Sequence, residues 1–199
     1  MAGLTALVRT IDLGVDARTP LTTAQITTIA AWRDRLEDVT TATCRGEAVR
    51  LARRIRTLDA DLATNRDGIT TLVSQDTPEL LELTGVGPVV AAGVLIAWSH
   101  PGRVRSEAAL ASLAGTCPIP ASSGNTVRHR LNRGGDRRLN RVLTTITIVR
   151  MRVAPATRAY VARRRTEGRT TKEIMRSHKR YITRQLFRIL AAAHPLPAS

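Results

Sequence analysis

The sequence predicts an all-α protein in which a long coiled-coil helix precedes a compact helical domain. Apolar residues recur at helical spacing along most of the chain. Aromatic residues make up 3% of the sequence and all hydrophobic residues 43%, so the core must consist mainly of Leu, Ile, Val and Ala, as in packed helices. We expect a leader over residues 1–21, a helical and coiled-coil region over 22–77, the compact domain over 78–193 and a tail over 194–199.

The helical region begins after Pro20, where Thr22 suits a helix N-cap with Gln25 three residues on. A longer helix is expected over about residues 44–73, because its apolar positions alternate at spacings of four and three for about four heptads. The seam consists of Cys44, Ala48, Leu51, Ile55, Leu58, Leu62, Asn65, Ile69 and Leu72.

Two arrangements fit this heptad seam. An antiparallel helix pair within the chain would use residues 22–40 as the partner, whereas a coiled coil between two copies would form a dimer. Asn65, the polar residue of the seam, is typical of a position that sets register or partner choice. The pattern by itself leaves both arrangements open.

The stretch "LTGVGPVVA", residues 83–91, predicts a helix-hairpin-helix-like element. Gly85 and Gly87 permit a tight turn and a close approach of the backbone to a ligand, and Pro88 suits the first turn of the next helix. The N–H groups of such a turn can bind a DNA phosphate without reading sequence. An ordinary helical corner would use the same glycines, but the basic residues that follow favour DNA.

A long basic loop is expected over "TCPIPASSGNTVRHRLNRGGDRR", residues 116–138, where prolines and glycines interrupt any period. Long loops in compact domains are often functional. Asp136 can cap a helix that runs to about Val153. The basic residues expected on the outer face of that helix are Arg137, Arg138 and Arg141.

A last helix is expected over about residues 171–193. Its apolar stripe consists of Ile174, His178, Tyr181, Ile182, Leu186 and Ile189. The basic residues off the stripe are Lys179, Arg180, Arg184 and Arg188. Because few acidic residues are available to pair with them, we expect them to face phosphates rather than to form an ordinary solvated surface.

Charge is concentrated in the second half of the chain. The total is +15, yet residues 1–100 carry 10 Arg and 12 acidic residues, whereas residues 101–199 carry 21 Lys and Arg and only 4 acidic residues. A half this basic favours a polyanionic partner, and nucleic acid is the usual one because neutralised phosphates release counterions. A ribosomal or membrane-surface protein would show a similar excess, so charge defines the class of partner only.

Several other classes of function are disfavoured. Cys44 and Cys117 lack the spacing of a disulfide framework or zinc site, and no apolar run reaches the roughly 18 to 20 residues of a membrane span. No secretory signal or phosphate-cradling Gly-x-x-x-x-Gly-Lys loop occurs. The histidines lie apart from one another and from carboxylates. We therefore expect a cytoplasmic, nucleoid-associated protein with no membrane partner, no metal site and no cofactor in this chain.

The adjacent serines Ser122 and Ser123 raise the question of chemistry in the basic loop. A serine hydroxyl can attack a phosphodiester if a base removes its proton and positive charge stabilises the phosphate. Arg128, Arg130 and Arg133 can supply the charge, and His129 lies nearby in sequence. From these residues alone, however, Ser-Ser-Gly is more typical of a turn.

Three stretches in order resemble the C-terminal half of the insertion-sequence-110/116/902 family of transposases. They are "LLELTGVGPVVAAGVL", "RVRSEAALASLAGTCPIPASSGNTVRHRLNRGGDRRLNRVL" and "KRYITRQLFRIL", over roughly residues 79–190. The family's "PxxxSG" hallmark falls on Pro120 to Gly124, and its "GxRRL"-like helix start on Gly135 to Leu139. The combination is specific, although each stretch alone would be weak.

The resemblance implies a DNA recombinase that cuts and rejoins strands through a loop serine. The family's serine directly precedes glycine and falls on Ser123, with Ser122 as the fallback because the doubled serine blurs the register. Family members also bind a guide RNA from the element, and a linking coiled coil joins their protomers, which favours the dimer. The residues that we expect at the DNA are Gly85, Gly87, Arg128, Arg130, Arg133, Arg137, Arg138 and Arg141.

One departure from the family limits this expectation. The family carries an N-terminal RuvC-like domain with metal-binding carboxylates, and no segment of that length precedes the coiled coil here. Mg²⁺ is then expected only through a separate acidic domain, and this chain alone is expected to bind DNA without recombining it. The alternatives are a non-enzymatic DNA- or RNA-binding remnant or regulator, and a ribosomal-type RNA-binding protein, which would not explain the glycine hairpin.

Overall fold

The computed structural model describes residues 2–10, 14–120, 129–130, 132 and 134–195 of the chain. The chain divides into two compact units, Met1–Asp67 and Gly68–Ser199, each with its own hydrophobic core. The division lies inside the longest helix, whereas the sequence analysis expected a boundary near residue 77.

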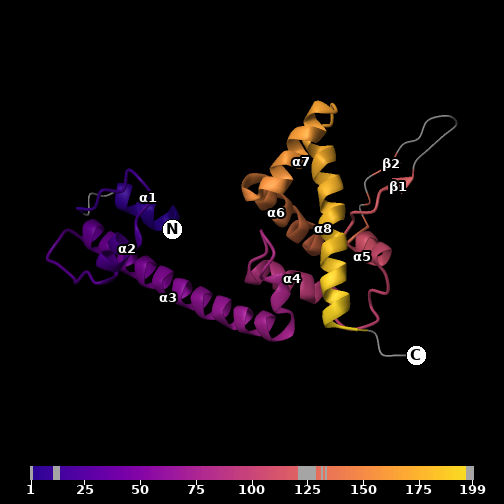
Figure 1. The fold of residues 1–199 in the computed structure, drawn as a ribbon. Helices are drawn as coiled ribbons and strands as arrows, with labels where there is room; N and C mark the ends of the chain where they lie inside the picture. Colours follow the sequence, from indigo (N-terminus) through magenta and orange to yellow (C-terminus); the bar gives the residue numbers. More distant parts are fainter. Residues whose placement is uncertain (1, 11–13, 121–128, 131, 133, 196–199) are drawn as a thin grey trace. The chain divides into compact units, whose positions relative to one another are not determined.

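The described residues are predominantly helical, which confirms the all-α fold class (Figure 1). The only strands among them form a two-stranded ribbon. In chain order the elements are α1 (Ala2–Thr10), α2 (Thr23–Ala30), α3 (Val39–Asp76), the 3₁₀ helix η1 (Pro78–Leu80), α4 (Pro88–Trp98), α5 (Glu107–Leu113), β1 (Ile119–Pro120), β2 (His129–Arg130), α6 (Arg137–Val153), α7 (Pro155–Thr166) and α8 (Thr171–Ala193).

The first unit is a small helical core that includes the N-terminal residues. Leu4 and Val8 of α1 are buried, so the interpretation of residues 1–21 as a leader is wrong: these residues contribute to a core. The sequence pattern did not predict this helix, because its 9 residues are too few for the apolar positions to show a clear helical period. The buried cluster consists of Leu4, Val8, Ala17, Leu21, Ile26, Ile29, Ala30, Ala48 and Ala52.

Helix α2 begins at the capping box that the sequence predicts. The side chain of Thr22 accepts a hydrogen bond from the backbone of Gln25, and the Gln25 side chain accepts one from the backbone of Thr22. The helix ends at Ala30, so the expected partner helix over residues 22–40 is shorter than predicted. The non-helical segment after it is held to α3 by the Arg45 guanidinium, which donates to Glu37 at 2.8 Å.

Helix α3 contains the predicted heptad seam but buries only part of it. Ala48 and Ala52 lie in the core of the first unit, with Leu51 and Ile55 packed against it. Further along, Leu58, Leu62 and Leu72 are 41%, 64% and 67% exposed. The intramolecular pairing therefore covers the start of the seam, and the described residues leave these leucines largely exposed.

The second unit is built around α6 and α8. Helix α8 packs against α5, α6 and α7, and α6 also packs against α4 and α7 (Figure 1). Gly93 allows the close approach of α4 to α6, because a Cβ there would lie 2.8 Å from Cγ2 of Val142. The buried members of this core include Leu80, Val94, Trp98, Leu110, Leu143, Ile146, Ile182, Leu186 and Leu190.

Most of the predicted apolar stripe of α8 is buried, but Ile189 is half-buried and Tyr181 is exposed. Tyr181 is 54% exposed, so its assignment to the core-facing stripe is wrong. Its neighbours Ile182 and Leu186 point into the core instead. His178 is buried as predicted, and no hydrogen-bond partner for its Nε2 occurs among the described residues.

Hydrogen bonds hold the backbone at both ends of the basic loop. At its N-terminal end, β1 pairs antiparallel with β2, with Ile119 opposite Arg130 and Pro120 opposite His129. At its C-terminal end, the amide of Asn132 donates to the Ser112 carbonyl at 3.2 Å, and the N–H of Asp136 donates to the Leu113 carbonyl at 2.6 Å.

Gly135 lies directly against the end of α5. A Cβ at this position would lie 2.6 Å from the Gly115 nitrogen and 2.7 Å from the Leu113 carbonyl oxygen, both of which are backbone atoms. No rotamer change can relieve such contacts, so only glycine allows the backbone after α5 and the backbone before α6 to touch.

We predict that Gly135→Ala destabilises the protein by about 2 to 3 kcal/mol in urea unfolding, because backbone must shift to admit the methyl group. Gly134→Ala is the matched control: its Cβ would meet only Oδ1 of Asn132, at 3.5 Å, an ordinary contact. It should change stability by less than about 1 kcal/mol. Equal effects of the two substitutions would contradict the close contact.

We also predict that His178 makes the protein less stable in mild acid. Burial lowers the pKa of His178 from its ordinary value of 6.5, and the nearby Arg150 charge lowers it further. The unfolded chain therefore binds a proton more readily than the folded chain below about pH 6.5, and stability falls there by at most about 1.4 kcal/mol per pH unit.

Urea unfolding at pH 7.5 and pH 5.5 measures this effect. His178→Gln should lose less stability between these two pH values than the unmodified protein does. His100→Gln, at an exposed histidine, is the control and should leave the pH dependence unchanged. An unaltered pH dependence in His178→Gln would show that the buried imidazole is not its source.

Candidate nucleic-acid interface

The glycine hairpin before α4 is a tight turn that packs on α6. The N–H of Val86 donates to the Leu83 carbonyl at 3.0 Å, and Gly85 has φ of 86°. A Cβ on Gly85 would lie 3.2 Å from both the Ile146 carbonyl oxygen and Cβ of Val149. Gly85 is therefore required both by its left-handed backbone and by the close approach of α6.

Arg150 ties this turn to the rest of the unit. Its Nε donates to the Thr84 carbonyl at 2.8 Å, and another guanidinium nitrogen donates to Oε1 of Gln185 at 2.8 Å. Burial lowers the pKa of Arg150. The role of Arg150 was not predictable, because nothing in the linear pattern distinguishes an arginine that donates to a backbone carbonyl from the other arginines of the basic half.

Gly87 plays a different part from Gly85. It is the N-cap of α4, with φ of −93°, and a Cβ there would meet nothing within 4 Å. No side chain caps the first turn of α4, and Pro88 occupies the start of the helix as predicted. The element before the turn is the three-residue η1, so a helix-hairpin-helix stays a prediction.

The start of α6 presents three arginines next to the loop. Asp136 is the N-cap, and its Oδ1 accepts from the N–H groups of Arg138 at 2.7 Å and Leu139 at 3.0 Å, as the sequence predicts. Arg137, Arg138 and Arg141 are exposed, and no ion pair is found for them among the described residues.

The predicted serines and some of the predicted DNA-binding residues lie outside the described residues. These are Ser122, Ser123, Arg128 and Arg133. For Arg130 the backbone lies in β2, opposite Ile119, and its side chain is not described. The structure therefore describes the backbone that flanks the serines, in β1, in β2 and at the N-cap of α6, and not the serines themselves.

The four basic residues expected to face phosphates on α8 behave differently from one another. Lys179 donates to Oδ1 of Asn140 at 3.1 Å, and Asn140 in turn donates to the Ala114 carbonyl at 2.7 Å. Burial lowers the pKa of Lys179. Lys179 thus links α8 to α6 and, through Asn140, to the end of α5. Its side chain is half-buried and does not face the surface.

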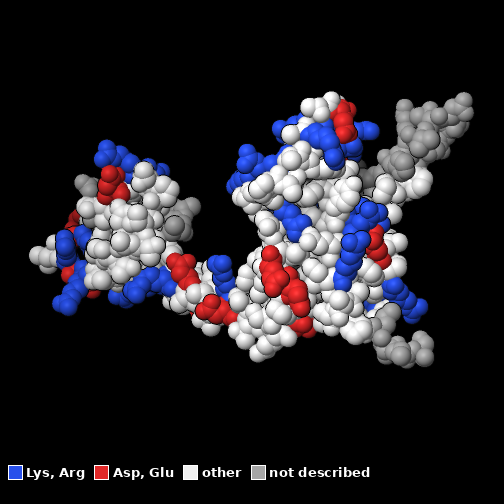
Figure 2. Space-filling view, viewed as in Figure 1, with Lys and Arg blue, Asp and Glu red and all other residues white. Residues whose placement is uncertain are grey.

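Arg180 and Arg184 share one carboxylate, that of Glu107 at the start of α5. Their guanidinium nitrogens lie 3.0 Å and 2.9 Å from Oε1 of Glu107. Arg188 is exposed, and no carboxylate partner for it occurs in the described part of the chain. Figure 2 shows Lys and Arg side chains gathered along α8 and where α7 meets α8. Positive charge therefore exceeds negative charge along α8, as expected.

Two further features bear on what the unit can do. No group of three or more His, Cys, Asp or Glu that could hold a metal ion lies among the described residues. Within the same residues, no helix combines the length and the apolar character needed to cross a membrane.

Comparison with known proteins shows a similarity over part of the second unit. Residues 78–162 match the model of the family described as "Transposase IS116/IS110/IS902 family". A similar protein is the "Insertion element IS110 uncharacterized 43.6 kDa protein" of Streptomyces coelicolor (strain ATCC BAA-471 / A3(2) / M145), 33% identical over 108 residues. The alignment covers 53% of this chain and 27% of that protein, so the matched part is about a quarter of its relative's length.

The matched residues include the glycine hairpin, both ends of the basic loop and the whole of α6. Residues 78–162 are therefore similar to a domain of the IS116/IS110/IS902 family of transposases.

Proposed function

We propose that this chain is the DNA-binding and catalytic-serine part of an insertion-sequence transposase, and that Ser123 is its nucleophile, with Ser122 as the fallback. The observation that carries the proposal is the family match over residues 78–162, which spans the serine loop. The anchoring of that loop supports it: β1 and β2 pair at one end, and Gly135 fits against Gly115 at the other.

The proposed chemistry is an exchange of phosphate esters. The Ser123 oxygen attacks the phosphorus of a DNA phosphodiester, its proton passes to a base, and a new serine–phosphorus ester bond forms. The bond to a deoxyribose oxygen breaks, and that oxygen takes up a proton. One ester replaces another, so the reverse attack by a deoxyribose hydroxyl can rejoin strands without an energy source.

The arginines beside the loop are proposed to hold the DNA. Arg137, Arg138 and Arg141 project from the first turns of α6, and Asp136 satisfies the N–H groups of the first turn. Arg128, Arg130 and Arg133 within the loop are proposed to lie nearer to the attacked phosphate, where they stabilise the charge that develops. The glycine hairpin at Gly85 and Gly87 supplies a further backbone contact to phosphate.

A complete reaction is proposed to need a second, acidic domain. No metal-binding group of side chains lies in the described part of this chain, so the Mg²⁺ that the family resemblance implies is assigned to carboxylates elsewhere. An element-encoded guide RNA is proposed as a further partner of the basic half.

The chain is also proposed to form a homodimer through α3. Leu58, Leu62 and Leu72 continue the heptad seam beyond the part that is buried in the first unit. Exposed leucines at heptad spacing are what a second copy of the helix can cover.

The nucleophile is tested by trapping a covalent adduct. The chain is mixed with the carboxylate domain of a family relative and a nicked DNA substrate, and protein–DNA adducts are separated under denaturing conditions. We expect an adduct with the unmodified chain and with Ser122→Ala, and none with Ser123→Ala. The opposite pattern would place the nucleophile at Ser122. An adduct in the variant that lacks both serines, or no adduct in any sample, would contradict the serine mechanism. The chain would then be a DNA-binding module without serine chemistry.

The DNA contact at α6 is tested by the salt dependence of duplex binding. Replacing Arg137, Arg138 and Arg141 by Ala should reduce the slope of log K against log salt by about one for each arginine. Arg18→Ala with Arg50→Ala is the control, because these exposed arginines of the first unit are paired with Asp16 and Glu47. If both sets change the slope equally per arginine, then binding is not localised to α6.

The dimer is tested by light scattering. Leu58→Gln with Leu62→Gln should convert a dimer to a monomer, because two buried apolar contacts per chain are lost from the seam. Ala60→Gln with Ala63→Gln, two exposed positions off the seam, should leave the dimer intact. A monomeric unmodified chain, or a dimer that survives the leucine substitutions, would contradict pairing through α3.

A further inference from the structure

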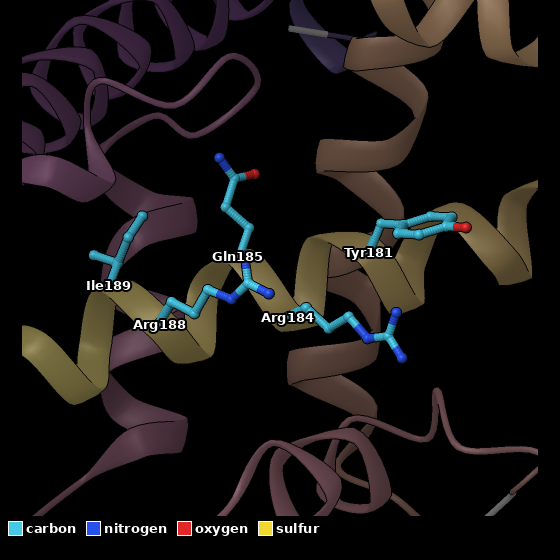
Figure 3. Close-up of a pocket in the computed structure, with 5 residues that line it drawn as sticks. All are labelled: Tyr181, Arg184, Gln185, Arg188 and Ile189. Atoms are coloured by element: carbon cyan, nitrogen blue, oxygen red, sulfur yellow. The ribbon is translucent and has the colours of Figure 1, made fainter.

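An open groove of about 490 Å³ lies along α8 (Figure 3). All the lining residues come from one helix at spacings of three and four, so they share one face. They are Tyr181, Arg184, Gln185, Arg188 and Ile189. The serine loop contributes none of them.

Tyr181 offers an exposed aromatic surface in a chain that has very few. The sequence contains only two tyrosines, and both lie here: the rings of Tyr160 and Tyr181 are 6.0 Å apart, edge to face at 83°. Tyr160 on α7 thus braces the ring of Tyr181, which is nevertheless 54% exposed. A braced, exposed ring is a platform on which an unpaired nucleobase can stack.

One of the two positive charges of the groove, that of Arg184, is held in place by its neighbours. Nε of Arg184 donates to Glu107 at 2.9 Å, and the guanidinium carbon lies 6.0 Å from the centre of the Tyr181 ring. Glu107 also binds Arg180, so one carboxylate faces two guanidiniums and a positive charge remains. Arg188 adds another charge two turns along the helix from Tyr181.

Gln185 completes the groove with an oriented amide. Its Oε1 accepts from Arg150 at 2.8 Å, and Arg150 is itself fixed on the Thr84 carbonyl. This contact determines which end of the amide is engaged. Among the described residues, no acceptor for Nε2 of Gln185 is found, so its N–H donors are available to the edge of a base.

We propose that this groove binds an unpaired nucleobase together with its flanking phosphates. The base stacks on Tyr181, Ile189 supplies an apolar contact, and Gln185 donates to an acceptor on the base edge. Arg184 and Arg188 contact the phosphates on either side. A base within a duplex cannot present its face to a tyrosine, so the ligand is a single-stranded segment of nucleic acid. This surface differs from the α6 arginines and does not depend on the chemistry of Ser123.

Fluorescence anisotropy with the full chain tests the proposal. The probes are a labelled 12-nucleotide single strand as DNA, the same sequence as RNA, its duplex, and a single strand with abasic positions. We expect Tyr181→Leu to weaken single-strand binding about tenfold and duplex binding less than twofold. Tyr181→Phe should bind like the unmodified chain, because the stacking face is kept. The tighter of the DNA and RNA arms identifies the sugar of the ligand.

Two controls separate stacking from charge and from misfolding. Arg188→Ala should weaken binding to the intact and the abasic strand alike, whereas Arg176→Ala, at another exposed arginine of α8, should weaken neither. Tyr181→Leu should lower binding to the intact strand only, and its thermal midpoint should match that of Tyr181→Phe.

Three outcomes would overturn the proposal: undiminished single-strand binding in Tyr181→Leu, an equal loss for single strand and duplex, or equal affinity of the unmodified chain for intact and abasic strands. None of these measurements uses the covalent adduct, so failure here is distinguishable from failure of the serine mechanism.

Discussion

The backbone contact between Gly135 and the end of α5 is the constraint on which the second unit depends. Because no side chain separates Gly135 from Gly115, the Asp136 N–H reaches the Leu113 carbonyl and α6 starts where α5 stops. Asn140, one turn later, binds the Ala114 carbonyl and receives Lys179. One close approach thus fixes the end of the basic loop, the direction of α6 and the position of α8.

The basic residues of α8 differ in the contacts that their side chains make. Of its basic residues, Lys179 is used in bracing, Arg180 and Arg184 share Glu107, and Arg188 faces solvent. A single carboxylate between two arginines orients both and leaves excess positive charge on this surface. The half-buried Arg150 of α6 donates instead to the Thr84 carbonyl of the glycine turn. Similar residues in sequence therefore have three different physical roles.

Local features were predictable because their causes lie within one turn of helix. The capping box at Thr22, the cap at Asp136 and the exposure of Arg137, Arg138 and Arg141 follow from neighbours three or four residues away. The burial of Leu4 and Val8 was not predictable, because two turns are too few for a periodic signal. The exposure of Tyr181 was also missed: its spacing suits the core stripe, but Tyr160 holds the ring at the edge.

The sequence by itself determined that the chain is helical, that its second half is strongly basic and that residues 78–162 resemble one transposase family. These properties depend on composition and on short-range patterns, which a linear reading contains. Only the tertiary structure decided which glycines cannot be replaced, which arginines are paired with other groups of the chain and where an aromatic ring stays exposed. Those properties depend on contacts between residues that are distant in sequence, and packing alone decides them.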